Sequence, residues 1–75
     1  FSIIVGGFQE RNLANQYLDH ISNDWAPEAF LARYNNKYYI VHSIHSSRPE
    51  ADRAKAAVNN KGNRAWILSS SLRRI

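Results

Sequence analysis

The sequence contains no cysteine, which excludes a disulfide framework, a thiolate nucleophile and a cysteine-based zinc site. It also lacks any apolar run approaching the roughly 20 residues of a membrane-spanning helix, and no signal peptide is visible. We therefore expect this segment to make no contact with a membrane. Its 75 residues leave room for a single domain, and 44% hydrophobic residues are typical of a folded chain. Because the chain begins directly at a strand, we expect it to be part of a longer protein.

Residues with catalytic chemistry are few and scattered. None of the six carboxylates is placed as one half of a general acid–base pair. His42 and His45 stand three positions apart on an expected strand, which puts them on opposite faces and makes a shared metal ion unfavourable. Gly6-Gly7 lacks the lysine of a phosphate loop. The sequence therefore predicts no enzyme, no catalytic residue, no metal site and no cofactor.

The strongest pattern is the opening stretch Phe1–Phe8, FSIIVGGF, a short β-branched run closed by two glycines and an aromatic residue. Such a run is typical of a buried strand. Residues 38–45, YYIVHSIH, repeat it without a gap, so that Ile3 aligns with Ile40 and Gly6 with Ser43. The helices expected after these strands keep the same offset, and the strands expected after the helices nearly keep it. The sequence therefore contains two copies of one strand–helix–strand unit. Because neither copy can bury its apolar face alone, the two copies should share one core.

Two amphipathic helices follow the two repeated strands. The first enters at residues 9–12, ends at residues 22–24, and has an apolar stripe at Leu13, Ala14, Tyr17, Leu18 and Ile21. The second begins at a capping box, Ser47 to Glu50, with a proline in its first turn. Its stripe consists of Ala51, Ala54, Ala57 and Val58, and residues 59–62 end it. Because this second stripe is thin, the helix should lie close to the sheet.

The remaining strands complete a βαββαβ order. Residues 28–34 form the second strand, Asn35-Asn36 a two-residue hairpin turn that requires positive φ, and Lys37 starts the third strand. Residues 64–68 form the fourth strand, and residues 69–75 form a tail with little to bury it. The sequence thus predicts an α+β, ferredoxin-like fold: a four-stranded antiparallel sheet with two helices on one face.

Alternation along each strand divides its side chains between the two faces of this sheet. The side chains expected toward the helices are Phe1, Ile3, Val5, Ala29, Leu31, Tyr38, Ile40, His42, Ala65 and Ile67. Those expected on the open face are Ser2, Ile4, Phe30, Ala32, Tyr39, Val41, Ser43, Trp66 and Leu68. A register shift of one residue would instead move the second set into the core. An apolar and aromatic face left to water usually marks a contact site.

Four motifs in order resemble SPOR domains, the peptidoglycan-binding modules named for sporulation-related repeats. Residues 3–8 with Ala14 are similar to "V-x-V-G-S-F … A", and residues 37–45 to "K-Y-R-V-x-V-G-P-F". Residues 46–51 are similar to "S-S-R-E-E-A", and residues 65–68 to "A-W-V-L". The resemblance covers residues 1–68, which we take as the domain, and leaves residues 69–75 as the tail.

The resemblance implies a non-catalytic module that binds glycan strands of bacterial peptidoglycan, with preference for strands that lack stem peptides. It places the protein in the bacterial cell envelope, in the periplasm or on an outer-membrane-anchored parent, at the division septum, where other envelope proteins are further partners. Glycan binding through the open sheet face points to Ile4, Gly7, Phe30, Tyr39, Val41 and Trp66.

Two alternatives remain open at this point. The chain departs from the family where Ile4 replaces a common glutamine and Tyr39 a common arginine, and this loss of polar groups favours a protein-interaction or self-association domain that uses the same apolar face. An open sheet with aromatic residues and a net charge of +4 also describes an RNA-recognition fold. The basic residues are scattered, however, and the aromatic-rich basic motif of that fold is missing, so we expect no nucleic-acid partner.

Overall fold

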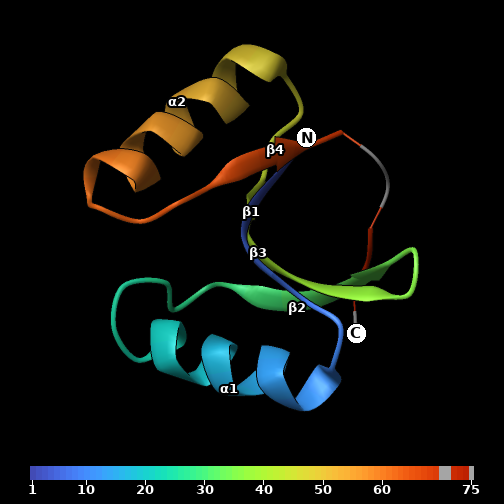
Figure 1. Ribbon diagram of the computed structural model, residues 1–75. Helices are drawn as coiled ribbons and strands as arrows, with labels where there is room; N and C mark the ends of the chain where they lie inside the picture. The colour runs from blue at the N-terminus through green and yellow to red at the C-terminus, as the bar shows by residue number, and fades with distance from the viewer. Residues whose placement is uncertain (70–71, 75) are drawn as a thin grey trace.

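The described chain is α+β, with two helices and five strands. The computed structural model describes residues 1–69 and 72–74, and its elements are β1 (Ser2–Phe8), α1 (Arg11–Ser22), β2 (Phe30–Tyr34), β3 (Lys37–Ile44), α2 (Arg48–Asn60), β4 (Trp66–Leu68) and β5 (Arg73–Arg74) (Figure 1). All strands pair antiparallel in one open sheet of order β4-β1-β3-β2-β5. The α+β prediction is confirmed, but the predicted count of four strands is wrong. Neither helix in the described ranges is long and apolar enough to cross a membrane.

Local chemistry explains where these elements begin and turn. The backbone N–H of Glu50 donates to Ser47 Oγ at 3.4 Å, so the predicted cap of α2 is confirmed. Asn35 and Asn36 have φ of 51° and 63°, the left-handed values that the hairpin between β2 and β3 requires. Glu10, by contrast, precedes α1 without a side-chain capping bond. The position of α1 therefore depends on packing of its apolar stripe against the sheet.

Both helices pack against one side of the sheet. We call the buried side chains between the helices and the sheet the helix-facing cluster. Figure 1 shows α1 alongside β2 and α2 alongside β4 on that side. The buried members of the cluster are Ile3, Val5, Ala14, Ile21, Ala26, Leu31, Ile40, Ala51, Val58 and Ala65. Leu13 was expected in the α1 stripe but is 48% exposed, because it lies one position off the line formed by Ala14, Tyr17 and Ile21. Ala57 was expected in the α2 stripe and is also exposed.

Two β-bulges interrupt the pairing of β1 with β3. Ile3 pairs with Ser43 and Ile4 with Val41, so His42 has no partner in the ladder, and the next pair, Gly6 with Ile40, leaves Val5 unpaired. An unpaired residue reverses the alternation of side chains beyond it. Ser43 therefore shares the helix-facing side with its partner Ile3, and its predicted place on the opposite face is wrong.

The C-terminal residues are part of the sheet rather than a tail with little to bury it. Arg73 and Arg74 form β5, which pairs with Arg33 and Ala32 of β2. Leu72 packs against the face of the sheet opposite the helices. The expectation for the tail is thus wrong at residues 72–74, while residues 70, 71 and 75 lie outside the described part of the chain. This short strand is the fifth strand of the sheet, and the sequence pattern does not predict it.

Candidate functional site

The face opposite the helices carries its own apolar group, which we call the second cluster. Its buried members are Ile4, Ala32 and Val41, and Phe30, Tyr39, Leu68 and Leu72 pack against them. Trp66 joins this side, since it pairs with Ile4 across β1 and β4. The predicted division of these side chains between the two faces is therefore confirmed.

Ile4 and Val41 are not available at the surface, contrary to the expectation of an open face. Both are 0% exposed. They lie on the neighbouring interior strands β1 and β3, and Leu72 together with the large side chains around them covers them. Any ligand on this face therefore contacts the aromatic side chains that cover Ile4 and Val41, and it does not contact Ile4 and Val41 themselves.

Phe30 lines a different hollow from Tyr39 and Trp66. The guanidinium carbon of Arg74 lies 4.5 Å from the centroid of its ring, so a cation from β5 already occupies one side of that ring. Phe30 borders a hollow of about 370 Å³ that Ser69, Leu72 and Arg74 also line. The predicted site residues therefore border two different hollows, and the C-terminal residues line the one at Phe30.

Gly7, Tyr39 and Trp66 come together on the accessible part of the face, and we call them the open cluster. Gly7 and Tyr39 are direct partners across β1 and β3. A Cβ atom placed on Gly7 would lie 3.3 Å from Tyr39 Cε1 and 4.0 Å from Trp66 Cζ2, so both rings border the bare glycine backbone. A side chain at position 7 would crowd the Tyr39 ring, and glycine is the residue that lets the ring lie across β1.

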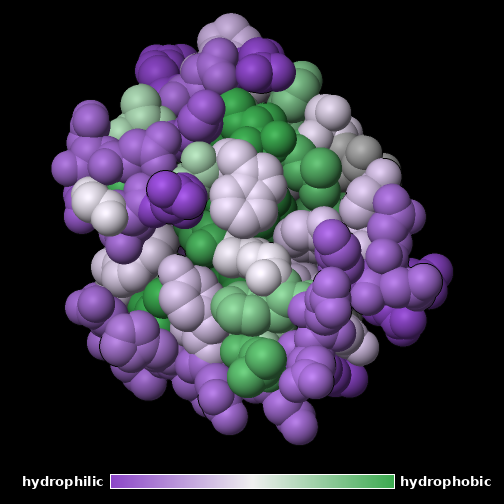
Figure 2. Space-filling model, viewed as in Figure 1, coloured by the Kyte–Doolittle hydropathy of each residue, from purple (hydrophilic) through white to green (hydrophobic). Residues whose placement is uncertain are grey.

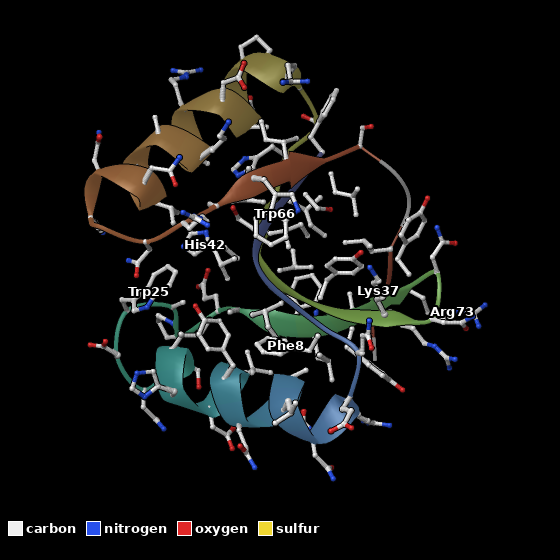
Figure 3. The ribbon with its side chains drawn as sticks, in the orientation of Figure 1. Phe8, Trp25, Lys37, His42, Trp66 and Arg73 are labelled. Carbon is white, nitrogen blue, oxygen red and sulfur yellow. The ribbon has the colours of Figure 1, made fainter. Side chains whose placement is uncertain are left out.

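The open cluster borders an open hollow of about 410 Å³. Its lining consists of Gly7, Phe8, Gln9, Lys37, Tyr39 and Trp66. Figure 2 shows apolar and weakly polar atoms through the middle of this view, with hydrophilic side chains on both sides. In Figure 3, Trp66 lies near the centre of the view and Lys37 toward the hairpin end of the sheet. Two flat rings beside a cation and an amide suit a ligand with apolar C–H faces, hydroxyls and an anionic group.

Gln9 and Lys37 are the polar residues that the sequence reading did not assign to the site. Lys37 stands two positions before Tyr39, so strand alternation alone would have placed it on the same face. Gln9 follows the end of β1, where no periodicity applies. Of the six predicted residues, the structure brings together Gly7, Tyr39 and Trp66.

The bulge at His42 forms a second polar group, on the helix-facing side. His42 Nδ1 lies 3.2 Å from Ser43 Oγ, and Ser43 Oγ lies 2.9 Å from His45 Nε2. The expectation that His42 and His45 point to opposite faces is therefore wrong, because the bulge turns both toward one hydroxyl. His42 also stacks on Trp25 at a centroid distance of 5.7 Å and an interplanar angle of 20° (Figure 3). Within the described ranges, no three His, Asp or Glu side chains are grouped to hold a metal ion.

The environment of His42 makes the stability of the fold depend on pH. Burial lowers the pKa of His42 below 6.5, and the charges of His45 and Lys61 lower it further, against an opposing effect of Glu28. The unfolded chain therefore binds more protons just below pH 6.5, so the free energy of unfolding should fall as pH decreases from 6.5 through the folded-state pKa. Urea denaturation at pH 7.5, 6.5 and 5.5 measures this.

The control for this prediction is His42→Phe, which keeps a ring against Trp25 but does not titrate. The variant should lose less stability than the wild type between pH 6.5 and 5.5. An unchanged pH dependence would assign the effect to other groups.

Comparisons with known protein families, with curated proteins and with solved structures find no match to this chain.

Proposed function

We propose that this chain is a non-catalytic module that binds glycan strands of bacterial peptidoglycan on the open cluster. The observation that supports this is the meeting of Gly7, Tyr39 and Trp66 at one hollow, with two rings accessible beside a bare backbone segment. Flat amphipathic rings suit the C–H faces of pyranose sugars. The resemblance of residues 1–68 to SPOR domains implies peptidoglycan as the glycan, and we infer from it a parent protein in the cell envelope at the division septum.

The sheet supports the finer assignment of fold that this function implies. Without β5, the strand order is β4-β1-β3-β2, with both helices on one side. This is the order expected for a ferredoxin-like βαββαβ unit, and we infer that β5 is an addition to that unit. Leu72, which precedes β5, then covers Ile4 and Val41, and the open cluster remains as the contact surface.

Lys37 supports a preference for strands without stem peptides. The stem peptide is joined to the sugar as an amide, and an amidase that removes it leaves a free carboxylate in its place. Lys37 lines the same hollow as Tyr39 and Trp66, so its ammonium group can meet a carboxylate on a sugar that rests on the rings. Among the described residues, no acidic side chain lines this hollow to compete for Lys37.

The alternative is self-association, or binding of a protein, through the same face. The covering of Ile4 and Val41 leaves less bare apolar surface for such an interface than the sequence predicts. We therefore favour the glycan. Sedimentation velocity over a hundredfold range of protein concentration tests the alternative, which requires the sedimentation coefficient to rise with concentration.

The glycan proposal is tested by co-sedimentation with purified sacculi, before and after digestion with an amidase. We expect more protein in the pellet after digestion, because digestion exposes the strands and frees their carboxylates. Equal pelleting with both preparations would contradict the preference for bare strands. Absence from both pellets would rule out the glycan function.

A further inference from the structure

Two arginines lie directly opposite each other at the edge of the sheet. Arg33 of β2 and Arg73 of β5 are Cα partners in the antiparallel ladder, so their side chains leave the same face. The guanidinium carbon of Arg33 lies 5.9 Å from the centroid of Tyr38, whose ring packs against the helix-facing cluster. The pair is thus on the opposite side of the sheet from the open cluster. Like charges in directly opposite positions destabilise a sheet.

The hairpin turn beside this pair forms a hydrogen bond with the guanidinium group of Arg33. Arg33 Nη2 donates to Asn36 Oδ1 at 3.4 Å, and the positive φ of Asn35 and Asn36 fixes the turn that carries that oxygen. An open hollow of about 380 Å³ lies between the turn and β5. Its lining consists of Arg33, Tyr34, Asn35, Asn36 and Arg73.

Among the residues that the structure describes, no carboxylate pairs with Arg33 or Arg73. Across residues 1–69 and 72–74, the one ion pair joins Arg48 and Asp52 on α2, with Nε and Oδ1 3.2 Å apart. Lys37 adds a further positive charge at the same end of the sheet, where Figure 3 shows it with Arg73. The hairpin end therefore concentrates positive charge that has no counterion within the described part of the chain.

We propose that Arg33 and Arg73 form a binding site for a phosphate group, separate from the glycan surface. A guanidinium presents a planar fork of N–H donors that matches two oxygens of one anion. A planar carboxylate is satisfied by one such fork, whereas a tetrahedral phosphate has oxygens left for the second arginine. Its double negative charge also balances both cations. The ligand class is therefore a phosphomonoester, from a soluble phosphate or from a lipid headgroup.

The test is a titration of the full chain with inorganic pyrophosphate, followed through the Nε–Hε signals of the arginines by NMR. Chloride is added to a reference sample to match the ionic strength. The signals of Arg33 and Arg73 should shift with pyrophosphate and not with chloride. Arg73→Gln should weaken binding at least about tenfold, since one of two charged forks is lost. Equal shifts with chloride would overturn the site, because any counterion would then suffice.

Arg53→Gln is the matched control, since it removes the same charge from an exposed position on α2. This variant should bind pyrophosphate like the wild type. Arg33→Gln is the second site variant and should weaken binding like Arg73→Gln. Arg73→Gln should unfold at the same temperature as the wild type or higher without ligand, because it relieves the repulsion between the two cations. Equal weakening by Arg53→Gln would assign binding to net charge and overturn the proposal.

Vesicles identify the source of the phosphate. Flotation compares vesicles of phosphatidylcholine alone with vesicles that also contain phosphatidic acid, whose headgroup is a phosphomonoester. Binding to the second kind that is lost in Arg73→Gln assigns a lipid headgroup. Pyrophosphate binding without flotation assigns a soluble phosphate, and the absence of both overturns the proposal. Because no glycan is present, these outcomes are independent of the sedimentation with sacculi.

Discussion

Replacing Trp66 with alanine is expected to weaken binding to amidase-treated sacculi by at least about tenfold, or about 1.4 kcal/mol. The ring is 38% exposed and supplies one wall of the open cluster, so its removal takes away half of the stacking surface without emptying a buried position. Tyr39→Ala should have a similar effect, since the second ring lies across Gly7. The measurement is the concentration of sacculi at which half of the protein pellets. Unchanged pelleting of both variants would place the glycan elsewhere on the molecule.

The two tryptophans of the chain make a matched control for this prediction. Trp25 lies on the helix-facing side against His42, and Trp66 on the opposite side. In Trp25→Phe the remaining tryptophan is at the proposed site, and its fluorescence should change when soluble glycan fragments are added. In Trp66→Phe the remaining tryptophan is remote, and its fluorescence should stay constant. The reverse pattern would move the site to the helix-facing side.

The faces of the strands could be predicted because burial on a sheet follows a period of two. Ile3 and Ile4 are neighbours in sequence, both fully buried, and belong to different clusters, as alternation requires. The assignments of Phe30, Tyr39 and Val41 to the face opposite the helices succeeded for the same reason. Alternation is a local rule, so it holds wherever the ladder is regular.

The bulges could not be predicted, because they depend on how two strands meet. Strict alternation from Ile4 would turn Gly7 toward the helices, but the bulge at Val5 brings it opposite Tyr39. The unpaired residues Val5 and His42 stand at equivalent positions of the repeated unit, thirty-seven positions apart like Ile3 and Ile40. The repeat was visible in the sequence, but its bulge was not. This explains both the accessible glycine and the histidine pair that the sequence reading misplaced.

The sequence also could not predict that Leu72 covers the second cluster. Residues 69–75 carry two arginines and three serines, a composition with little to suggest a strand. β5 forms because the edge of β2 has unpaired backbone groups and Leu72 has an apolar cluster to bury against. These partners are about forty residues away in sequence, and no local pattern connects them. The charge pairing of Arg33 with Arg73 arises from the same contact.

Ile40→Ala is expected to cost about 2–5 kcal/mol of the free energy of unfolding. Ile40 is 0% exposed on the central strand β3, and its ladder partners are Gly6 on one side and Leu31 on the other. Gly6 has no side chain to move into the space, so the cavity should persist. A chain of 75 residues has a total stability of roughly 4–11 kcal/mol, at about 0.05–0.15 kcal/mol per residue. The loss is therefore large enough to leave much of the variant unfolded at 37 °C.

Leu13→Ala provides the comparison, because it deletes an aliphatic side chain that the structure leaves 48% exposed. Alanine is also the better helix former in α1, so the change should stay within about 1 kcal/mol. Urea denaturation followed by far-UV circular dichroism gives both values under one set of conditions. If the two variants lost similar stability, Leu13 would have to be buried in solution. The sequence places Leu13 and Ile40 alike in the core, so a large difference between them is the outcome that distinguishes the structure from the sequence pattern.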